Sequence, residues 1–260
     1  MATVSIGSRR GDGPRSGGER GAADMHLHSL YSDGTASVRQ ILDHVEAHTT
    51  LDVIAITDHE RIDGAARAAE LHAAGDYSFD LVVGEEVTTR RGHVLGLYVS
   101  ERIPALRPLA ETLATIHAAG GIAIAAHPLA PVPLSVGARS LRGARDHDHR
   151  DVYFDAIELF NPSYAGRVRQ AARLELNARE LGLPAVGNSD AHVLEGIGTG
   201  LTTFPGHTAE DYRAAIVDGT VLAEGSHWSS AHNVDVYRRQ LHAKLRHLWH
   251  TLRPGHHDWR

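Results

Sequence analysis

Two histidines one residue apart, His26 and His28, lie near the beginning of the chain. Side chains of a strand alternate between its two faces, so in an extended segment both imidazoles face the same side and can hold one ion between them. Asp33 follows five residues after His28 and precedes Gly34, where a turn can fold its carboxylate back beside the same ion or a neighbouring one. For a lone pair of histidines, the alternative is two neutral imidazoles with hydrogen-bond partners in a core.

Similar groups of acids and histidines recur further along the chain, each beside an apolar stretch that the pattern predicts to be a strand. These groups contain Asp58 and His59, Glu85, Glu86 and His93, His127, and Asp190 and His192. Polar groups at the carboxyl ends of buried strands are where α/β folds place their chemistry. If they meet in one pocket, they exceed the four ligands of a single zinc ion, and two or three ions sharing a carboxylate account for the surplus. The alternative is an ordinary barrel end with capping and hydrogen-bonding groups.

Strand and helix patterns alternate along the chain and predict an α/β fold. We expect strands near 22–28, 51–57, 79–87, 92–99, 121–126, 156–161, 183–187, 198–204 and 221–223, and helices near 37–48, 63–74, 105–119, 166–181, 209–218 and 234–252. This order favours a mostly parallel sheet, most simply a barrel whose strand ends converge on one face. The domain organisation we expect is a disordered tail over 1–21, a metal-binding barrel over 22–230, and a C-terminal amphipathic helix and tail over 231–260.

Composition limits the kind of metal site and partner. The 260 residues include no cysteine, so imidazole and carboxylate must hold any metal, which favours zinc, manganese or iron. The formal charge of 26 − 32 = −6 argues against a long nucleic-acid footprint but not against a small or end-bound anionic substrate. No apolar run reaches the roughly 20 residues of a membrane span, and the N-terminus lacks the apolar core of a signal peptide. We therefore expect a soluble, cytoplasmic protein with no membrane partner.

The long segment 129–151 is a candidate lid or exposed excursion. Its Arg139, Arg142 and Arg145 are candidates for binding a second phosphate or a nucleotide, against simple solvent exposure. His147 and His149 repeat the spacing of the first pair but lie in a polar run, so we do not expect them to be ligands. Elsewhere, Asp58 and Glu158 are candidates for orienting the ligating imidazoles, with a purely structural hydrogen-bonding role as the alternative.

Taken in order, several motifs between residues 22 and 225 resemble those of the PHP family, the polymerase and histidinol phosphatase group of metal-dependent phosphoesterases. The motifs are Asp24-x-His26-x-His28-x-x-x-Ser32-Asp33-Gly34, Thr57-Asp58-His59, Gly84-x-Glu86-Val87, His93 before Val94, His127-Pro128 and Ser189-Asp190-x-His192. The resemblance implies a distorted (β/α)7 TIM-like barrel with a trinuclear metal centre at one end.

The resemblance also assigns nine metal ligands. It implies one ion held by His26, His28 and Asp190, a second held by Asp33, His59 and His192, a third held by His93 and His127, and Glu86 as the bridging carboxylate. Glu86 matches the bridging position better than Glu85 because it is the second residue after the glycine. Asp33, His59, Glu86 and His192 are also the candidate catalytic residues. Asn188 stands where relatives often have glycine, a tolerable replacement if that position needs a positive φ.

From these observations we expect a metal-dependent phosphoesterase that hydrolyses a phosphate ester of a small, nucleotide-like molecule through a metal-bridging hydroxide. The enzyme alternative is an exonuclease acting on 5′-phosphorylated RNA or DNA ends, and the alternative of another class is a non-catalytic metal-binding regulatory module. Hydrolysis of a C–N bond, as in related metal barrels, is a further alternative. The variant of such sites that uses a carbamylated lysine has little support, because Lys244 is the only lysine. The chain lacks the helical insertion between His93 and His127 that longer relatives carry, so their substrates are not transferred to it.

Overall fold

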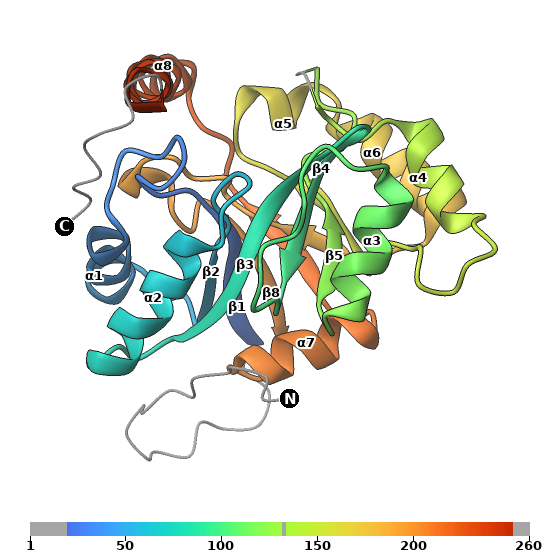
Figure 1. Cartoon of the computed structure of the whole chain (residues 1–260), viewed down its shortest axis with the longest axis horizontal. Coiled ribbons are helices and arrows are strands. Elements are labelled where there is room, and N and C mark those ends of the chain that lie inside the picture. The colour runs from blue at the N-terminus through green and yellow to red at the C-terminus, as the bar shows by residue number, and fades with distance from the viewer. Residues whose placement is uncertain (1–19, 132–133, 252–260) are drawn as a thin grey trace.

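The computed structural model describes residues 20–131 and 134–251, with the backbone alone for 242–251. Nearly all of the predicted N-terminal tail, residues 1–19, and the last nine residues of the chain lie outside this range. Within it, a nine-stranded sheet curls into a nearly closed barrel (Figure 1), which confirms the predicted TIM-like class. The strands are β1 (Arg20–Leu27), β2 (Val53–Ile56), β3 (Asp80–Thr89), β4 (Gly92–Leu97), β5 (Ile122–Ala125), β6 (Ala156–Phe160), β7 (Ala185–Gly187), β8 (Gly200–Pro205) and β9 (Leu222–Gly225).

The sheet order is β7-β6-β5-β4-β3-β2-β1-β8-β9, so the two ends of the sheet are β7 and β9. The barrel closes where these ends approach each other. At this seam β7 is hydrogen-bonded to β8, the neighbour of β9. The backbone N–H of Gly187 on β7 donates to Oγ1 of Thr202 on β8 at 3.0 Å, and that hydroxyl donates to the carbonyl of Gly187 at 2.8 Å. A Cβ at position 187 would lie 2.5 Å from the carbonyl oxygen of Leu201, so the close approach requires glycine.

Four of the eight pairs of neighbouring strands are parallel and four are antiparallel, because β4 runs antiparallel to β3 and β5, and β8 runs antiparallel to β1 and β9. The expectation of a mostly parallel sheet therefore holds for only half of the pairs. The reason for the first reversal is local. Only two residues, Arg90 and Arg91, separate β3 from β4, and Gly92 adopts a φ of +131°. So short a connection cannot join parallel strands, which need a crossover. The reversal brings His93, at the beginning of β4, to the end of the barrel where β3 finishes.

The helices surround the barrel (Figure 1) and follow the predicted order, with differences at several of their boundaries. They are α1 (Val38–His48), α2 (Asp63–Ala74), α3 (Leu109–Ala118), α4 (Ala138–Arg145), α5 (Tyr164–Val168), α6 (Gln170–Leu176), a π-helix η1 (Asn177–Leu181), a 3-10 turn η2 (Leu194–Gly196), α7 (Ala209–Val217) and α8 (Ser230–Thr251). Helix α3 begins at residue 109 rather than 105, with Pro108 as its N-cap in an extended conformation. The predicted single helix over 166–181 is divided into α5, α6 and η1, and α4 occupies the middle of the predicted loop 129–151.

Helix α1 shows how local chemistry sets these boundaries. Ser37 accepts a hydrogen bond from the backbone of Gln40 while the Gln40 side chain accepts one from the backbone of Ser37, which is a capping box. Its buried residues Val38, Ile41, Leu42 and Val45 recur at the predicted helical spacing and pack with β2 and α2. The apolar stripe therefore fixes the face that the helix turns to the barrel.

Helices α7 and α8 lie at opposite ends of the barrel (Figure 1). Helix α8 begins four residues earlier than predicted, and its Val236 is buried whereas Leu241 is 57% exposed. The apolar face of the predicted amphipathic helix is therefore only partly covered within residues 230–241. None of the described helices is long and apolar enough to cross a membrane.

His117 on α3 is expected to make the stability of the fold depend on pH. Its Nε2 lies 2.9 Å from Oδ2 of Asp155, and its Nδ1 lies 2.9 Å from the carbonyl oxygen of Asp151. Burial acts to lower the pKa of His117, but the hydrogen bond and charge of Asp155 raise it above its ordinary value of 6.5. Because the folded pKa is raised, the contribution is complete below pH 6.5 and is lost as pH rises through the folded value.

The measurement is the free energy of unfolding of wild type and His117→Gln, both treated with EDTA, between pH 5.5 and 8.5. We expect the variant's deficit to be largest at pH 5.5 and to shrink toward pH 8.5. His117 lies outside the metal-ligand clusters, so histidines elsewhere contribute equally to both proteins and cancel in the difference. A deficit that stays constant over this range would contradict the assignment.

Candidate metal centre

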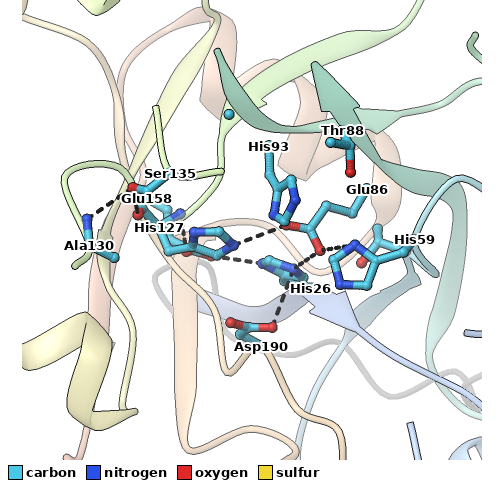
Figure 2. Close-up of polar contacts among 12 residues, drawn as sticks. His26, His59, Glu86, Thr88, His93, His127, Ala130, Ser135, Glu158 and Asp190 are labelled. Atoms are coloured by element: carbon cyan, nitrogen blue, oxygen red, sulfur yellow. Dashed lines mark hydrogen bonds and ion pairs between the residues drawn. The ribbon is translucent and has the colours of Figure 1, made fainter. Parts of the chain in front are cut away.

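Glu86 is the point on which the polar side chains at the β-strand ends converge (Figure 2). Its carboxylate is buried, and both of its oxygens face imidazoles. Five histidine nitrogens surround it: near Oε2 lie His26 Nε2 at 3.2 Å, His28 Nε2 at 3.3 Å and His59 Nδ1 at 3.2 Å, and near Oε1 lie His93 Nδ1 at 2.9 Å and His127 Nε2 at 3.0 Å. The structure thus brings together five histidines from four separate places in the sequence.

Protons alone do not satisfy this arrangement. A carboxylate oxygen has two lone pairs, yet three imidazole nitrogens crowd Oε2 of Glu86. His28 is fully buried, and neither of its ring nitrogens has a hydrogen bond of normal geometry within the described residues. Converging nitrogen and oxygen lone pairs in a buried site are what divalent cations require, so the donor set fits metal ions.

Four overlapping groups of side chains have ligand atoms within 4.8 Å of one another. The groups are His26, His28 and Asp190; His28, Asp33, His59 and His192; His26, Glu86 and His127; and His59, Glu86 and His93. The first two contain the sets implied for the first and second ions, with His28 added to the second. His93 and His127 do not form a group of their own, since each is grouped through Glu86 with a different histidine. All nine predicted ligands nevertheless lie in one continuous cluster.

Glu158 on β6 orients two of the histidines. This is the first of the two roles considered for it from the sequence. Its Oε1 lies 3.2 Å from Nδ1 of His26, and its Oε2 accepts the backbone N–H of His127 at 2.7 Å. The side-chain amide of Asn188 donates to Oε1 at 3.0 Å. By contacting Nδ1 of His26, Glu158 turns Nε2 of that ring toward Glu86.

Asp58 does not orient an imidazole; its role is the structural alternative. Its carboxylate accepts the backbone N–H of Ser29 at 2.7 Å and the hydroxyls of Ser29 and Ser32, each at 2.6 Å. These bonds fold the turn between His28 and Asp33. Asp58 therefore positions two candidate ligands through the backbone rather than through their rings.

Asn188 does not have a positive φ, so the condition under which it would replace a glycine for conformational reasons is not met. In the same motif it is Asp190 that has a left-handed φ, of 52°. Asn188 acts through its amide, which accepts from the backbone of Met25 at 3.0 Å and donates to Glu158. The buried Asp24 holds the same loop, since it accepts the backbone N–H groups of Ser189 at 3.0 Å and Gly198 at 2.9 Å. Sequence reasoning missed this role, although Asp24 shares the strand face of His26.

The charges of the cluster are set by burial and by neighbouring groups. Burial, and then the positive charge of His192, lowers the pKa of His28 to about 3, so its ring is neutral at pH 7. Burial also acts against a charged His192, but Asp33, 3.1 Å away, raises the pKa of His192 to about 9. Burial acts to raise the pKa of Glu86, yet the charges of the surrounding histidines hold it well below its usual value. A metal ion would replace the proton on His192, because a ligating imidazole must be neutral.

The cluster lies at the base of a cavity of about 570 Å³. Sequence reasoning missed the residues of its upper wall: Trp228, Tyr237 and Gln240 from the C-terminal segment, and Asn161, whose amide lies 3.3 Å from Asp190. Four carboxylate residues line the cavity, and its described lining includes no lysine or arginine. No local signal connects α8 to this site, because Tyr237 and Gln240 are more than 140 positions away in the sequence from the lining residues of β3 and β4.

Several candidates from the long segment lie away from this cavity. Arg142 and Arg145 bind η1 instead: Arg142 pairs with Glu180 at 2.5 Å, and Arg145 donates to the carbonyl of Glu180 at 2.9 Å. His147 and His149 are exposed and belong to none of the metal-ligand groups among the described residues.

Comparisons with known proteins agree with this architecture. A family model described as PHP-associated matches residues 169–221. An uncharacterized protein of Methanocaldococcus jannaschii, MJ1587, is 32% identical over 150 residues, which are 54% of this chain and 81% of that protein. The phosphoribosyl 1,2-cyclic phosphate 1,2-diphosphodiesterase of Eggerthella lenta is 35% identical over 102 residues, 36% of this chain but only 38% of that enzyme.

The fold is shared with a solved two-domain protein from Bacteroides vulgatus that contains a predicted PHP-like metal-dependent phosphoesterase. The TM-score is 0.58 at 16% identity, covering 91% of this chain and 75% of that one. Matched family, shared barrel and the cluster of histidines and carboxylates lead to the same answer. The chain belongs to the PHP family.

Proposed function

We propose that the protein hydrolyses a phosphate ester of a small, nucleotide-like molecule at the Glu86 cluster. The observation that carries the proposal is the contact of five histidines with the two oxygens of one buried carboxylate. The negative lining of the cavity supports it, since a phosphate would meet carboxylates and no basic side chain among the described lining residues unless cations were bound there.

The proposed metal ligands are the nine residues predicted from the sequence: His26, His28, Asp33, His59, Glu86, His93, His127, Asp190 and His192. Two or three divalent ions bound there would act as Lewis acids on the phosphoryl group and lower the pKa of water. The catalytic roles proposed for Asp33, His59, Glu86 and His192 are those of ligands close to the reacting phosphate.

The chain's own contribution is to hold these groups still. Glu158 fixes the ring of His26 and the backbone of His127, and Asp58 fixes the turn that carries Asp33. Nδ1 of His192 lies 2.9 Å from the carbonyl oxygen of Asp190, which leaves Nε2 facing Asp33. Groups prepositioned in this way need no reorganisation as negative charge develops on the phosphoryl oxygens.

The upper wall of the cavity supports a leaving group with a planar ring. Trp228 and Tyr237 offer aromatic faces, and Gln240 and Asn161 offer amides that can hydrogen-bond the edge of a base. The volume of about 570 Å³ suits a small ligand. We therefore place the ring of the substrate against α8 and the phosphate against the metal ligands.

Truncating Tyr237 tests this placement. We expect Tyr237→Ala to raise KM for a nucleoside monophosphate by about 3- to 10-fold, because an aromatic contact is lost. Tyr237→Phe keeps the ring and is expected to retain the wild-type KM. The measurement is steady-state phosphate release with the nucleotide and with ribose 5-phosphate, which has no base. An equal rise in KM for both substrates would contradict contact between Tyr237 and a base.

The test of the function combines a metal assay with phosphate release. The substrates are nucleoside mono- and bisphosphates, histidinol phosphate and short 5′-phosphorylated oligonucleotides. We expect two or three bound ions per wild-type chain and phosphate release from a small molecule, both lost in His26→Ala. The control is His48→Ala, an exposed histidine on α1 outside the metal-ligand groups.

Three outcomes would overturn the proposal. Metal without turnover on any substrate would favour a non-catalytic binding module. Turnover confined to oligonucleotides would favour the exonuclease. Retained metal and activity in His26→Ala would move the chemistry away from this cluster.

A further inference from the structure

A second cavity, of about 730 Å³, lies on the outer side of the β3–β4 turn and carries a concentration of positive charge. Arg90 and Arg91 from that turn and Arg139 from the first turn of α4 line it, and no aspartate or glutamate is among its described lining residues. We call this cavity the arginine cleft. The chain as a whole has a net charge of −6, so the charge of the cleft is opposite in sign to that of the whole protein.

The three guanidinium groups of the arginine cleft are not neutralised by the described part of the protein. Arg91 and Arg139 take part in no ion pair or hydrogen bond between described side chains, and Arg90 donates only to the neutral carbonyl of Leu106, at 2.9 Å. Arginines elsewhere are commonly paired with acids, namely Arg61 with Asp63, Arg67 with Glu70, Arg107 with Glu111, Arg142 with Glu180 and Arg239 with Asp235. Three like charges around one cavity repel each other, and a bound anion would relieve that repulsion.

The rest of the lining adds an apolar floor to this charged rim. Leu109 and Leu113 of α3 contribute to the floor, together with Ala144 and Val152. Ser140 and His147 add polar groups near the rim. Guanidinium groups bind phosphate oxygens in pairs, and the volume of the cleft falls in the range of small-molecule sites. The chemistry therefore matches a ligand with a phosphate group and an apolar or planar part.

The arginine cleft is separate from the metal centre. Among the described lining residues the two cavities share only Leu134, and the cleft contains none of the nine proposed ligands. The backbone carbonyl of Leu134 accepts the N–H of His93 at 2.8 Å, so the wall between the cavities is attached to β4. A ligand of the cleft would thus bind on the other side of this wall from the phosphate that is hydrolysed.

We propose that the arginine cleft is a second binding site for a phosphorylated small molecule, held by Arg90, Arg91 and Arg139 and independent of the metal ions. Of the three arginines that the sequence suggested for a second phosphate, the structure leaves only Arg139 available, and it adds two from a turn nearly 50 residues earlier. Arg142 and Arg145 are engaged with η1.

The test is calorimetric binding to the full-length protein after EDTA treatment, with pyrophosphate and adenosine 5′-diphosphate as probes at low salt. We expect one equivalent of each to bind wild type, and the double variant Arg91→Ala/Arg139→Ala to bind about 10- to 100-fold more weakly because charge-assisted hydrogen bonds are lost. The matched control, Arg39→Ala/Arg238→Ala, removes two exposed arginines outside both cavities and is expected to bind as wild type does.

Several results would overturn the proposal. Equal affinity of wild type and the cleft variant would place the anion elsewhere, and equal weakening of the control would mean non-specific attraction. Binding that disappears on EDTA treatment would belong to the metal centre. Affinity for a 5′-phosphorylated oligonucleotide that rises with its length would indicate a nucleic-acid backbone instead of a small molecule. Because binding is measured without turnover, these results are independent of the phosphate-release assay.

Discussion

Glu86→Gln is expected to lower kcat for phosphate release by about 10³-fold and to remove most of the bound metal. Glutamine has nearly the same shape as glutamate, so the substitution changes the charge and one acceptor at the centre of the cluster. If the amide nitrogen replaced Oε2, it would face the nitrogens of His26, His28 and His59, and if it replaced Oε1, it would face those of His93 and His127. An NH₂ group donates hydrogen bonds and cannot accept them from these rings as a carboxylate oxygen does. The neutral amide is also a much weaker metal ligand than a carboxylate.

The measurements for this variant are metal content and phosphate release at saturating substrate, with circular dichroism as the check of folding. Glu85→Gln is the matched control. Glu85 is the adjacent residue on β3, but its carboxylate accepts the backbone N–H of Ile103 at 3.1 Å and faces away from the imidazoles. We expect the control to keep its metal. If Glu85→Gln lost metal and Glu86→Gln did not, the assignment of the bridging residue would be reversed.

Glu158→Gln is expected to weaken metal binding by about 10- to 100-fold, although Glu158 is not itself a proposed ligand. The carboxylate contacts three different groups: Nδ1 of His26, the backbone N–H of His127 and the amide of Asn188. A glutamine side chain has only one oxygen, so in either orientation its NH₂ group faces at least one donor. The ring of His26 loses the partner that sets its orientation, or the backbone of His127 loses its acceptor.

A positioning role has a signature that distinguishes it from general damage to the fold. We expect Glu158→Gln to need a higher concentration of metal for half-maximal activity and to regain much of the wild-type kcat when the metal is saturating. The matched control is Glu101→Gln, an exposed glutamate outside both cavities, which is expected to behave as wild type. A loss of kcat that saturating metal does not restore would contradict a role limited to positioning.

The ligand set was accessible from the sequence because its signals are local. His26 and His28 share a face through strand alternation, and His59, Glu86 and Asp190 follow or close apolar stretches that the structure confirms as strands. The boundaries of α1 and α2 were predicted correctly for the same reason, since apolar spacing, and in α1 the N-cap Ser37, act over a few residues. The barrel class followed from the alternation of such elements.

Features that depend on pairing or on distant contacts were not accessible in this way. The reversal of β4, which places His93 beside Glu86, depends on the hairpin at Gly92 and on the choice of strand partner. Asn188 looked like a substitute for glycine, but its amide connects β1 to β6. The wall formed by Tyr237 and Gln240 places the last helix at the same cavity as residues of β3 and β4.

The arginine cleft shows the same division. Arg139 was visible as a basic residue in a long segment, but only the folded chain shows that Arg90 and Arg91 line the same cavity while Arg142 pairs with Glu180. The sequence by itself determined the elements and the chemistry at their ends, because propensity and periodicity are properties of neighbouring residues. The tertiary structure decided which ends meet, which charges are neutralised and what encloses the site, because these depend on contacts between residues far apart in the chain.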